Sequence, residues 1–555
     1  MKNHYSLLVS LLVTFTGFSQ IEVTTYRGAF APSPTPMWTA GWTNFDPQNA
    51  VYPAPTVDVT TNITTDTNWT ANNVYYLKSQ IYVKNGATLT IAAGTIIRAD
   101  HTAVGAGLFI TKGSKLNAIG TATSPIVFTS DYAAGSRSKG DWGGIVLLGK
   151  GSYNINAGVN NIEGIATSAD TQFGGGATPD DNDNSGTLKY VRIEFGGYVY
   201  AANQEINGLT LGAVGRGTTI DNVQVSFAND DSFEWFGGAV NCKHLVSYRG
   251  LDDDFDTDNG YSGNVQFCLG IRDPNISDNP TVSTSEGFES DNNSTSSTAT
   301  PFTSAVFTNC TLIGPSVRKN LPNAGVFATG YKRAARLRRN TQLKIYNSVF
   351  LDFEEGLFID GVTTEANANF GASTAGAGTL KWRNNILAGT ISTVSLVSST
   401  TAANSSALAN WYTLNNNTTV ASSANILTSL YNTADAQNYT ALDYRPTATS
   451  IAATGADFTD AILATLGTSD SNTISFEALV YPNPSTSNFK LLYNAISTDV
   501  VVTTVFDVSG RVIETKTLNY NEVENFEFGT AYNSGIYLVQ IKQGQATKTV
   551  KIIKN

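Results

Sequence analysis

Short apolar runs, each bounded by Gly, Asn or Asp, cover most of this chain of 555 residues. Alternating or continuous apolar runs of this length are typical of β-strands separated by tight turns. Helical spacing, with apolar residues three and four positions apart over several turns, is nearly absent. The pattern therefore predicts an all-β protein, with strands in the ranges Gln80–Arg98, Pro125–Ser130, Gly143–Leu148, Thr187–Phe195, Thr219–Phe227 and Leu343–Leu351.

One motif, an apolar anchor set among acids, recurs along the middle of the chain. The anchors Phe233, Phe255, Phe288 and Leu357 are separated by 22, 33 and 69 residues. Strand–turn repeats of this size form solenoids, because each repeat buries its inner face only against its neighbours. The intervals predict one coil, one coil with an added loop, and three coils of a β-helix.

Composition agrees with this prediction and narrows the function. Charged residues make up only 14 % of the chain, whereas long amphipathic helices need many Glu, Lys and Arg. The net charge of −11 repels phosphate backbones, so a nucleic-acid partner is not expected. Only three His occur, which leaves little scope for zinc sites or for a Ser–His–Asp triad.

The N-terminal region differs from the middle. Residues 1–19 hold a basic residue, an apolar stretch (Tyr5–Phe18) and two small residues before Gln20, which predicts a cleaved signal peptide. The stretch is shorter than the roughly 20 residues that span a bilayer, and no later run is longer, so no transmembrane segment is expected. Residues 20–75 contain six of the 16 prolines, and we interpret them as an extended leader or cap.

The last part of the chain, residues 476–555, has short alternating runs separated by Ser-Gly turns, which indicates a small β-sandwich. Its motifs YPNP, FDVSGR and GIY and its basic terminus resemble the type A C-terminal sorting domain of the type IX secretion system of Bacteroidota. The resemblance implies the type IX secretion machinery as a partner and a secreted or outer-membrane cell-surface location. The motif residues are Tyr481, Pro482, Asn483, Pro484, Gly510, Gly535, Tyr537, Lys551 and Lys554.

The middle stretch, residues 76–466, precedes a linker at 467–475 and resembles a second family. The phrases GDWGG (140–144) and TLKYVRIEF (187–195) are similar to those of secreted right-handed parallel β-helix proteins of the pectin-lyase-like type. We therefore expect a right-handed parallel β-helix followed by a small immunoglobulin-like β-sandwich. Residues 475–555 hold seven acids and seven bases, so the net negative charge belongs to the β-helix cargo. The resemblance fixes no activity.

Acids beside the anchors are the main candidates for chemistry. Because successive side chains of a strand point to opposite faces, Glu234, Asp256 and Glu289, which each follow an anchor, are expected to form an outward column. Unit charges about 4.8 Å apart repel by roughly 0.9 kcal/mol in water and by about 3.5 kcal/mol at an effective dielectric constant of 20. Such a column requires a cation, a basic partner or full solvation.

Two acidic loops place oxygens at alternate positions and end in a glycine turn, as calcium sites often do. Both lack the bidentate Glu of an EF-hand, and Asp and Asn also bond to their own backbone in ordinary turns. The candidate Ca²⁺ ligands are Asp252, Asp254, Asp256 and Asp258 in one loop, and Asp181 and Asp183 in the other.

The same acids are candidates for catalysis. Glycosidases use two carboxyl groups about 5–5.5 Å or about 6.5–9.5 Å apart, which adjacent coils can provide, whereas a polysaccharide lyase would use calcium and a basic residue. The candidate catalytic residues are Asp231, Asp253, Glu234, Asp256, His244 and Arg249. No known pectin-degrading motif is present beyond a loose Asn-Asp-Asp. We therefore favour a protein that binds glycans or mediates adhesion without catalysis, with a calcium-assisted polysaccharide lyase or glycoside hydrolase as the alternative.

Aromatic, basic and sulfur-containing residues leave further alternatives open. Rings near the acidic loops either stack on sugar faces or form internal stacks; they are Trp235, Tyr248 and Tyr261. The basic segment Arg318–Lys344 either pairs with the acidic column, binds an anionic glycan or faces solvent. Three cysteines lie in apolar runs and predict an inward stack, with a Cys242–Cys268 disulfide as the other possibility; they are Cys242, Cys268 and Cys310.

Overall fold

The computed structural model divides the chain into two compact units at Thr468, which we describe separately. It describes residues 21–155, 160–201, 204–281, 283–390, 396–399, 402–466, 478–493, 500–519, 526–543 and 546–555. The predicted signal peptide (1–19) and linker (467–475) lie outside the described residues.

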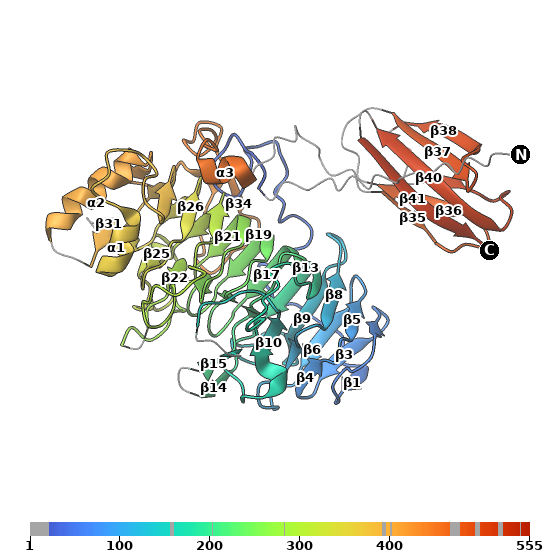
Figure 1. The fold of residues 1–555 in the computed structure, drawn as a ribbon, viewed down its shortest axis with the longest axis horizontal. Helices are drawn as coiled ribbons and strands as arrows, with labels where there is room; N and C mark the ends of the chain where they lie inside the picture. Colours follow the sequence, from blue (N-terminus) through green and yellow to red (C-terminus); the bar gives the residue numbers. More distant parts are fainter. Residues whose placement is uncertain are drawn as a thin grey trace, which may run out of the picture. The chain divides into compact units, whose positions relative to one another are not determined.

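The first unit is a parallel β-helix in which successive coils add strands to the same columns (Figure 1). One column is a sheet of ten parallel strands, called the ten-stranded sheet below. Its strands, in stacking order, are β4 (Gln80–Val83), β7 (Gly107–Ile110), β10 (Gly144–Leu148), β16 (Leu209–Gly212), β18 (Phe233–Phe236), β20 (Phe255–Asp258), β22 (Phe288–Ser290), β25 (Arg333–Leu337), β28 (Glu355–Ile359) and β31 (Leu396–Ser398). The predicted fold class is confirmed.

Two further columns form one large sheet, called the bent sheet below. Its long strands are β13 (Gly186–Glu194), β17 (Thr219–Ser226), β19 (Asn241–Tyr248) and β21 (Asn264–Ile271). Each changes direction at one residue with a left-handed backbone, at φ between 51° and 62°: Tyr190, Asn222, His244 and Phe267. The paired registers omit these residues, so the sheet turns a corner without a loop.

Shorter strands continue both columns of the bent sheet above and below the long ones. One column holds β2 (Thr67–Trp69), β5 (Thr88–Ile91), β8 (Lys115–Ile119), β23 (Val306–Thr308), β26 (Lys344–Tyr346) and β29 (Lys381–Arg383). The other holds β1 (Val57–Val59), β3 (Val74–Leu77), β6 (Ile96–Ala99), β9 (Ile126–Ser130), β24 (Thr311–Ile313), β27 (Val349–Leu351), β30 (Ile386–Ala388) and β32 (Thr418–Val420).

The predicted anchors stack inside the β-helix. Phe233 pairs with Phe255 and Phe255 with Phe288, at ring-centroid distances of 5.5 and 5.3 Å. The last interval spans two coils rather than the predicted three, because Ala335 is the partner of both Phe288 and Leu357. Long loops between Phe288 and Ala335 lengthen that coil, so the number of residues between anchors overestimates the number of coils.

Residues 21–56 form an N-terminal strap across the outer face of the bent sheet. The side-chain amides of Gln224 and Gln266 each exchange two hydrogen bonds with the strap backbone, at Asn44 and Glu22, at 2.7–2.8 Å. Among the described residues of the strap no strand occurs, in keeping with its prolines. The first strand, β1, begins at Val57, inside the range assigned to the leader.

Helices and hairpins decorate the coils. The helices are α1 (Val362–Ala368), α2 (Ala402–Leu414), α3 (Ala461–Leu466), η1 (Ala169–Thr171) and η2 (Arg318–Asn320). The hairpins are β11 (Asn160–Asn161) with β12 (Gln172–Phe173), β14 (Val199–Ala201) with β15 (Gln204–Glu205), and β33 (Leu427–Ser429) with β34 (Asp443–Pro446). The sequence pattern missed α2, although Leu408, Trp411 and Tyr412 lie three and four positions apart and are buried.

The second unit is a two-sheet β-sandwich, as predicted. One sheet holds β35 (Ala478–Tyr481), β36 (Phe489–Tyr493) and β39 (Glu527–Phe528). The other has the order β38 (Val512–Leu518), β37 (Val501–Asp507), β40 (Gly535–Gln543) and β41 (Ala546–Lys554). A separate hydrophobic core lies between the sheets and includes Phe489, Val505, Phe528, Val539 and Ile541.

The sorting motifs join these strands. Asn483 of the YPNP motif donates from Nδ2 to the Lys551 carbonyl (2.8 Å) and accepts the Ile553 amide at Oδ1 (2.9 Å), which ties the motif to β41. Gly510 lies in the turn between β37 and β38 at a φ of 83°, where a side chain is disfavoured. Tyr537 belongs to the core between the sheets.

We predict that the cargo folds without the sorting domain, because each unit has its own core. A chain that ends at Thr468 should show the same melting midpoint for the β-helix as the full chain and should not aggregate. Differential scanning calorimetry and analytical ultracentrifugation measure both properties. Unfolding or aggregation of the shortened chain alone would show that the units depend on one another.

Candidate functional site

The predicted column of acids exists on the outer face of the ten-stranded sheet. Strand pairing stacks Thr210, Glu234, Asp256, Glu289 and Arg336 on successive coils. Two acids of this column are almost inaccessible to solvent: Glu234 is 5 % exposed and Glu289 is 6 % exposed. Full solvation, one of the three ways to tolerate this repulsion, is therefore excluded for these two groups.

A second acidic column runs beside the first, at the turns that precede the strands. Asp231 Oδ1 accepts the backbone N–H of Asp253 (2.8 Å), and Asp253 Oδ1 accepts that of Glu286 (2.5 Å). Asn207 and Glu286 continue the pattern with the amides of the next coils. These carboxylates thus have a structural role, because each satisfies a backbone donor of the following coil.

The two columns converge into a cluster of seven acids, called the acid cluster below: Asp230, Asp231, Glu234, Asp252, Asp253, Asp256 and Glu289. Three sets of carboxylates each have oxygens within 4.8 Å of one another. The sets are Asp230, Asp231 and Asp252; Asp231, Glu234 and Asp256; and Asp253, Asp256 and Glu289.

Burial dominates the electrostatics of the acid cluster. It raises the pKa of Asp231, Glu234, Asp253 and Asp256 well above the usual values, and neighbouring carboxylates raise each pKa further. A charged carboxylate in such a place is unfavourable without a cation or a proton. Perturbed pKa values of this kind are common at functional sites.

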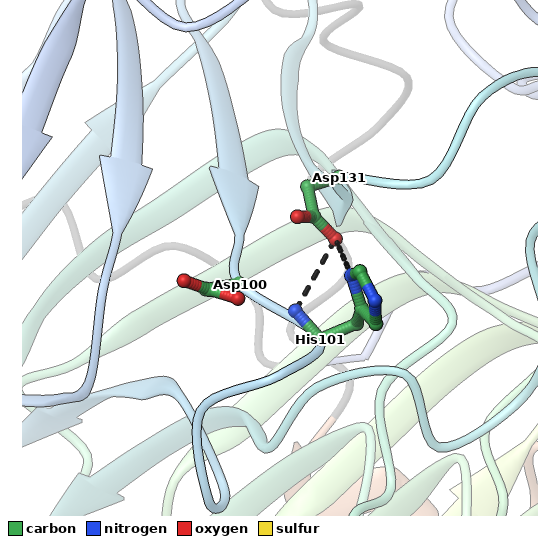
Figure 2. A group of neighbouring side chains, drawn as sticks. All are labelled: Asp100, His101 and Asp131. Atoms are coloured by element: carbon green, nitrogen blue, oxygen red, sulfur yellow. Dashed lines mark hydrogen bonds and ion pairs between the residues drawn. The ribbon is translucent and has the colours of Figure 1, made fainter.

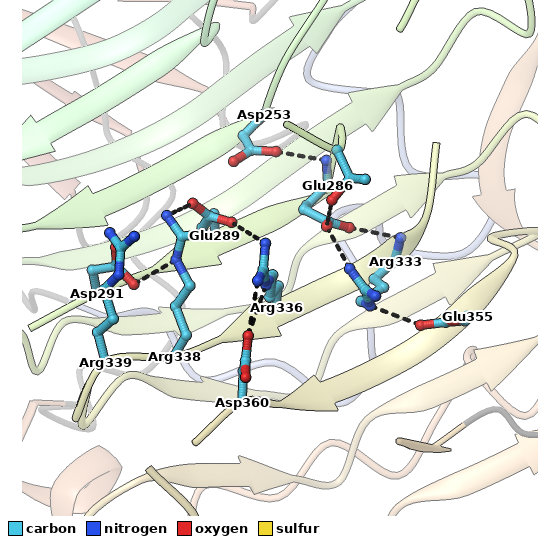
Figure 3. A network of polar contacts seen from close by, with 11 residues as sticks. Asp253, Glu286, Glu289, Asp291, Arg333, Arg336, Arg338, Arg339, Glu355 and Asp360 are labelled. Carbon is cyan, nitrogen blue, oxygen red and sulfur yellow. Dashed lines mark hydrogen bonds and ion pairs between the residues drawn. The ribbon is translucent and has the colours of Figure 1, made fainter. Parts of the chain in front are cut away.

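Arginines neutralise one end of the cluster (Figure 3). Arg338 forms ion pairs with Glu289 and with Asp291 (2.8 Å), and Arg336 lies 3.6 Å from Glu289 and 2.8 Å from Asp360. Arg333 and Arg339 form similar pairs with Glu286 and Asp291. Of the alternatives for the basic segment Arg318–Lys344, these four arginines therefore pair with acids of the neighbouring coils.

The other end of the cluster has no such partner. Within the described part of the chain, the side chains of Asp230, Asp252 and Asp256 form no ion pair within 4.0 Å, and Asp252 Oδ1 and Asp256 Oδ1 are buried atoms without a hydrogen bond. All three residues remain partly exposed. The arrangement leaves unused carboxylate oxygens that a hard cation can bind.

The four acids of the predicted calcium loop Asp252–Asp258 do not lie together in the structure. Asp252 and Asp256 join the acid cluster, but Asp254 turns into the core, where it is fully buried and paired with Arg272 (3.1 Å). Asp258 accepts the amide of Asn259 (2.6 Å). Because Asp254 precedes β20 at a turn, alternation along the strand does not govern its direction, so the four acids do not surround one point.

In the second predicted calcium loop, the two carboxylates accept hydrogen bonds from backbone amides. Asp181 Oδ1 accepts the Ser152 amide (2.7 Å), and Asp183 Oδ2 accepts the Lys150 amide (3.0 Å). These bonds join the loop to the next coil. They match the alternative in which such acids bond to backbone donors.

The two predicted basic residues are paired with acids outside the acid cluster. His244 Nδ1 is 2.7 Å from Asp221, and its ring packs between Trp38 and Phe267. Arg249 pairs with Asp273. His244 lies on β19, in another column of the β-helix. Arg249 begins the turn that leads to Asp252, but its guanidinium contacts Asp273 and the Tyr439 ring instead.

The predicted ligand-binding rings are internal. Trp235, Tyr248 and Tyr261 are fully buried, and the Trp235 and Tyr261 rings stack at 5.3 Å. The prediction that these rings contact sugar is wrong. Trp235 points inward from β18 beside Phe233, whereas Tyr248 is covered by Phe45 of the strap and by Tyr439. The internal-stack alternative is the one that the structure adopts.

The three cysteines match the first of the two alternatives, in which they are buried and form no disulfide. All three cysteines are buried and unpaired. Cys242 is in register with Val265, and Cys268 with Leu245, so the register does not place Cys242 opposite Cys268. They pack as small apolar side chains of the core.

Another acidic group, Asp100 with His101 and Asp131, lies on an earlier coil (Figure 2). Asp131 accepts from Tyr76 Oη (2.7 Å) and lies 2.7 Å from His101 Nδ1, while Lys78 pairs with Asp100 (2.6 Å). Each carboxylate already has a partner. This group is therefore stabilised internally and differs from the acid cluster.

Both units of the chain match known protein families. Residues 61–441 match the pectate-lyase-like β-helix domain, and residues 479–555 match the secretion-system C-terminal sorting domain. The chain therefore belongs to the pectate-lyase-like β-helix family, and its type IX sorting domain directs it to the cell surface or the medium. No curated protein matches it. A solved tailspike protein, from Dettilon, is similar at 10 % identity and a TM-score of 0.27, covering 60 % of this chain and 62 % of the tailspike.

No helix among the described residues is long and apolar enough to cross a membrane. The sorting domain implies the type IX secretion machinery as a partner.

Titration of the buried acids gives a prediction. Burial and the Asp291 carboxylate raise the pKa of Asp258 from 3.8 to about 8. The folded state then holds a proton that the unfolded state releases at about pH 4, so the free energy of unfolding falls as the pH rises between these values. In chelator, we expect a lower melting midpoint at about pH 8 than at about pH 5.5.

Asp258→Asn should reduce this difference between the two midpoints, and the exposed Asp58→Asn should leave it unchanged. Thermal scans at the two pH values test the sign. A wild-type midpoint that rises with pH over this range contradicts the prediction.

Proposed function

We propose that this protein is an exported β-helix that binds Ca²⁺ at the acid cluster and, through the ion, binds glycans at the cell surface or in the medium without catalysis. One observation carries the proposal: Asp230, Asp252 and Asp256 are partly exposed acids that have no ion-pair partner among the described residues and pack against buried carboxylates. Calcium takes six to eight oxygen ligands in irregular geometry. An ion held at a partly open edge keeps positions for sugar hydroxyl or carboxylate oxygens.

The chemistry of the donor set supports Ca²⁺ over softer metals. The candidate ligands are all carboxylate oxygens, which suit Ca²⁺ and Mg²⁺, and the cluster includes no thiolate or imidazole among its described members. One divalent ion would offset two carboxylate charges and so reduce the repulsion that the register imposes. The arginines complete this neutralisation at the far end of the column.

The state of the nearby bases supports binding without catalysis. Burial lowers the pKa of Arg338, but the carboxylates of Glu289 and Asp291 raise it by more, so that the pKa lies above its usual value. The guanidinium therefore keeps its proton and is a poor base. His244 lies beside Asp221, and Arg249 is paired with Asp273. None of these three residues is therefore in a state or position that suits a lyase base at the acid cluster.

A second candidate is a glycoside hydrolase, and the spacing of the acids favours it. Oxygens of Asp231, Glu234 and Asp256 lie within 4.8 Å of one another, close to the separation in retaining enzymes. The raised pKa values suit a general acid. Against this candidate, Asp231 and Glu234 are 6 % and 5 % exposed, and a substrate must reach both groups.

We predict that Ca²⁺ raises the melting midpoint of the cargo through Asp256. An ion that binds only the folded state adds about 2.7 kcal/mol at a hundredfold excess over Kd, which is several degrees for a domain of this size. Asp256→Asn should lose most of this increase, and Asp58→Asn should keep it. An equal midpoint in Ca²⁺ and in chelator would falsify the cation site.

Glycan binding is tested on a polysaccharide array with the secreted protein. We expect signals in Ca²⁺ that disappear in chelator and in Asp256→Asn, without release of sugar products. Reducing ends that appear with time and disappear in Glu234→Gln would favour the hydrolase instead. Unsaturated products would favour the lyase.

A further inference from the structure

One end of the four-stranded sheet of the sorting domain exposes a group of apolar side chains, called the sorting-domain patch below. Strand pairing places Phe506 between Val512 and Leu538, and Ile536 follows on the same face of β40. Val508 lies in the adjoining turn. Val512, Ile536 and Leu538 are 53 %, 42 % and 41 % exposed, and Val508 is 76 % exposed.

The patch does not belong to the core of the sandwich. Along β40, Tyr537, Val539 and Ile541 point inward and are buried, whereas Ile536 and Leu538 alternate with them and point outward. The same outer face becomes polar toward its other end, where Thr504 pairs with Gln540. The apolar side chains are therefore confined to one end, and contiguous exposed apolar surface of this kind marks interaction sites.

The charge of the face selects the partner. Lys551 is the register neighbour of Leu538, and Lys542 projects from the same face of β40. None of the outer-face positions of the four described strands holds an acid. Arg511, beside the patch, is paired with Asp507 (3.0 Å). The patch is thus an apolar surface with a basic flank.

We propose that the sorting-domain patch is the surface by which this domain docks on the type IX secretion machinery, on a component that presents an apolar strip flanked by acidic side chains. Burial of these side chains against the partner supplies affinity, and the lysines supply orientation. A second copy of this chain fits less well, because a twofold pairing would bring the same lysines together without acids to meet them.

Export of the full chain in cells that possess the machinery tests the proposal. The double variant Val512→Ser with Leu538→Ser removes apolar surface from two exposed positions. The matched control, Thr504→Ser with Gln540→Ser, alters the polar end of the same face. We expect the double variant to lose tenfold or more of the extracellular cargo and to accumulate it in the periplasm, with the control unchanged.

Folding is checked on the purified full chain by the melting midpoint of the sorting domain, which should change little because both apolar positions are exposed. Lys551→Glu provides a second test without loss of apolar surface and should also reduce export. Wild-type export of both the double variant and Lys551→Glu would overturn the proposal. So would a wild-type chain that sediments as a dimer and becomes a monomer in the double variant.

Discussion

In-register stacking of coils is the constraint on which the rest of the cargo depends. Each coil hydrogen-bonds to the next residue for residue, and the anchors Phe233, Phe255 and Phe288 lie above one another in the core. Because the anchors lock the register from inside, the residues that follow them are stacked outside as well. Glu234, Asp256 and Glu289 are therefore neighbours, and a slip of one residue would exchange inner and outer faces.

The fold stabilises stacked acids in two ways and leaves a third group unsatisfied. Acids at the turns accept a backbone amide of the following coil, as Asp231 and Asp253 do. Acids near β25, such as Glu289, form ion pairs with arginines of that strand and of the turn after it. The remaining carboxylates, around Asp252 and Asp256, have neither kind of partner in the part of the chain that the structure describes, although burial makes their charge unfavourable. These carboxylates are the part of the acid cluster on which the proposed cation site rests.

The two units expose their unfavourable groups in opposite ways. The cargo hides charge, with acids and arginines buried on the outer side of its sheet, and covers much of the bent sheet with the strap. The sorting domain is electrically balanced but exposes apolar side chains such as Val512 and Leu538. Each unit thus has a different kind of unsatisfied group near its surface: carboxylates in the cargo and apolar side chains in the sorting domain.

The β-helix, the sandwich and the outward column can all be predicted from the sequence, because alternation and repeat spacing act locally and leave a visible period. It did not determine which acids converge. Asp254 precedes its strand and turns to Arg272, eighteen positions later in the chain, and Trp235 and Tyr261 stack across coils inside the core. The neutralising arginines, Arg336 and Arg338, come from a coil separated from Glu289 by long loops. These pairings become visible only in the folded chain, because side-chain direction at turns and the number of residues per coil depend on contacts between coils rather than on spacing along one coil.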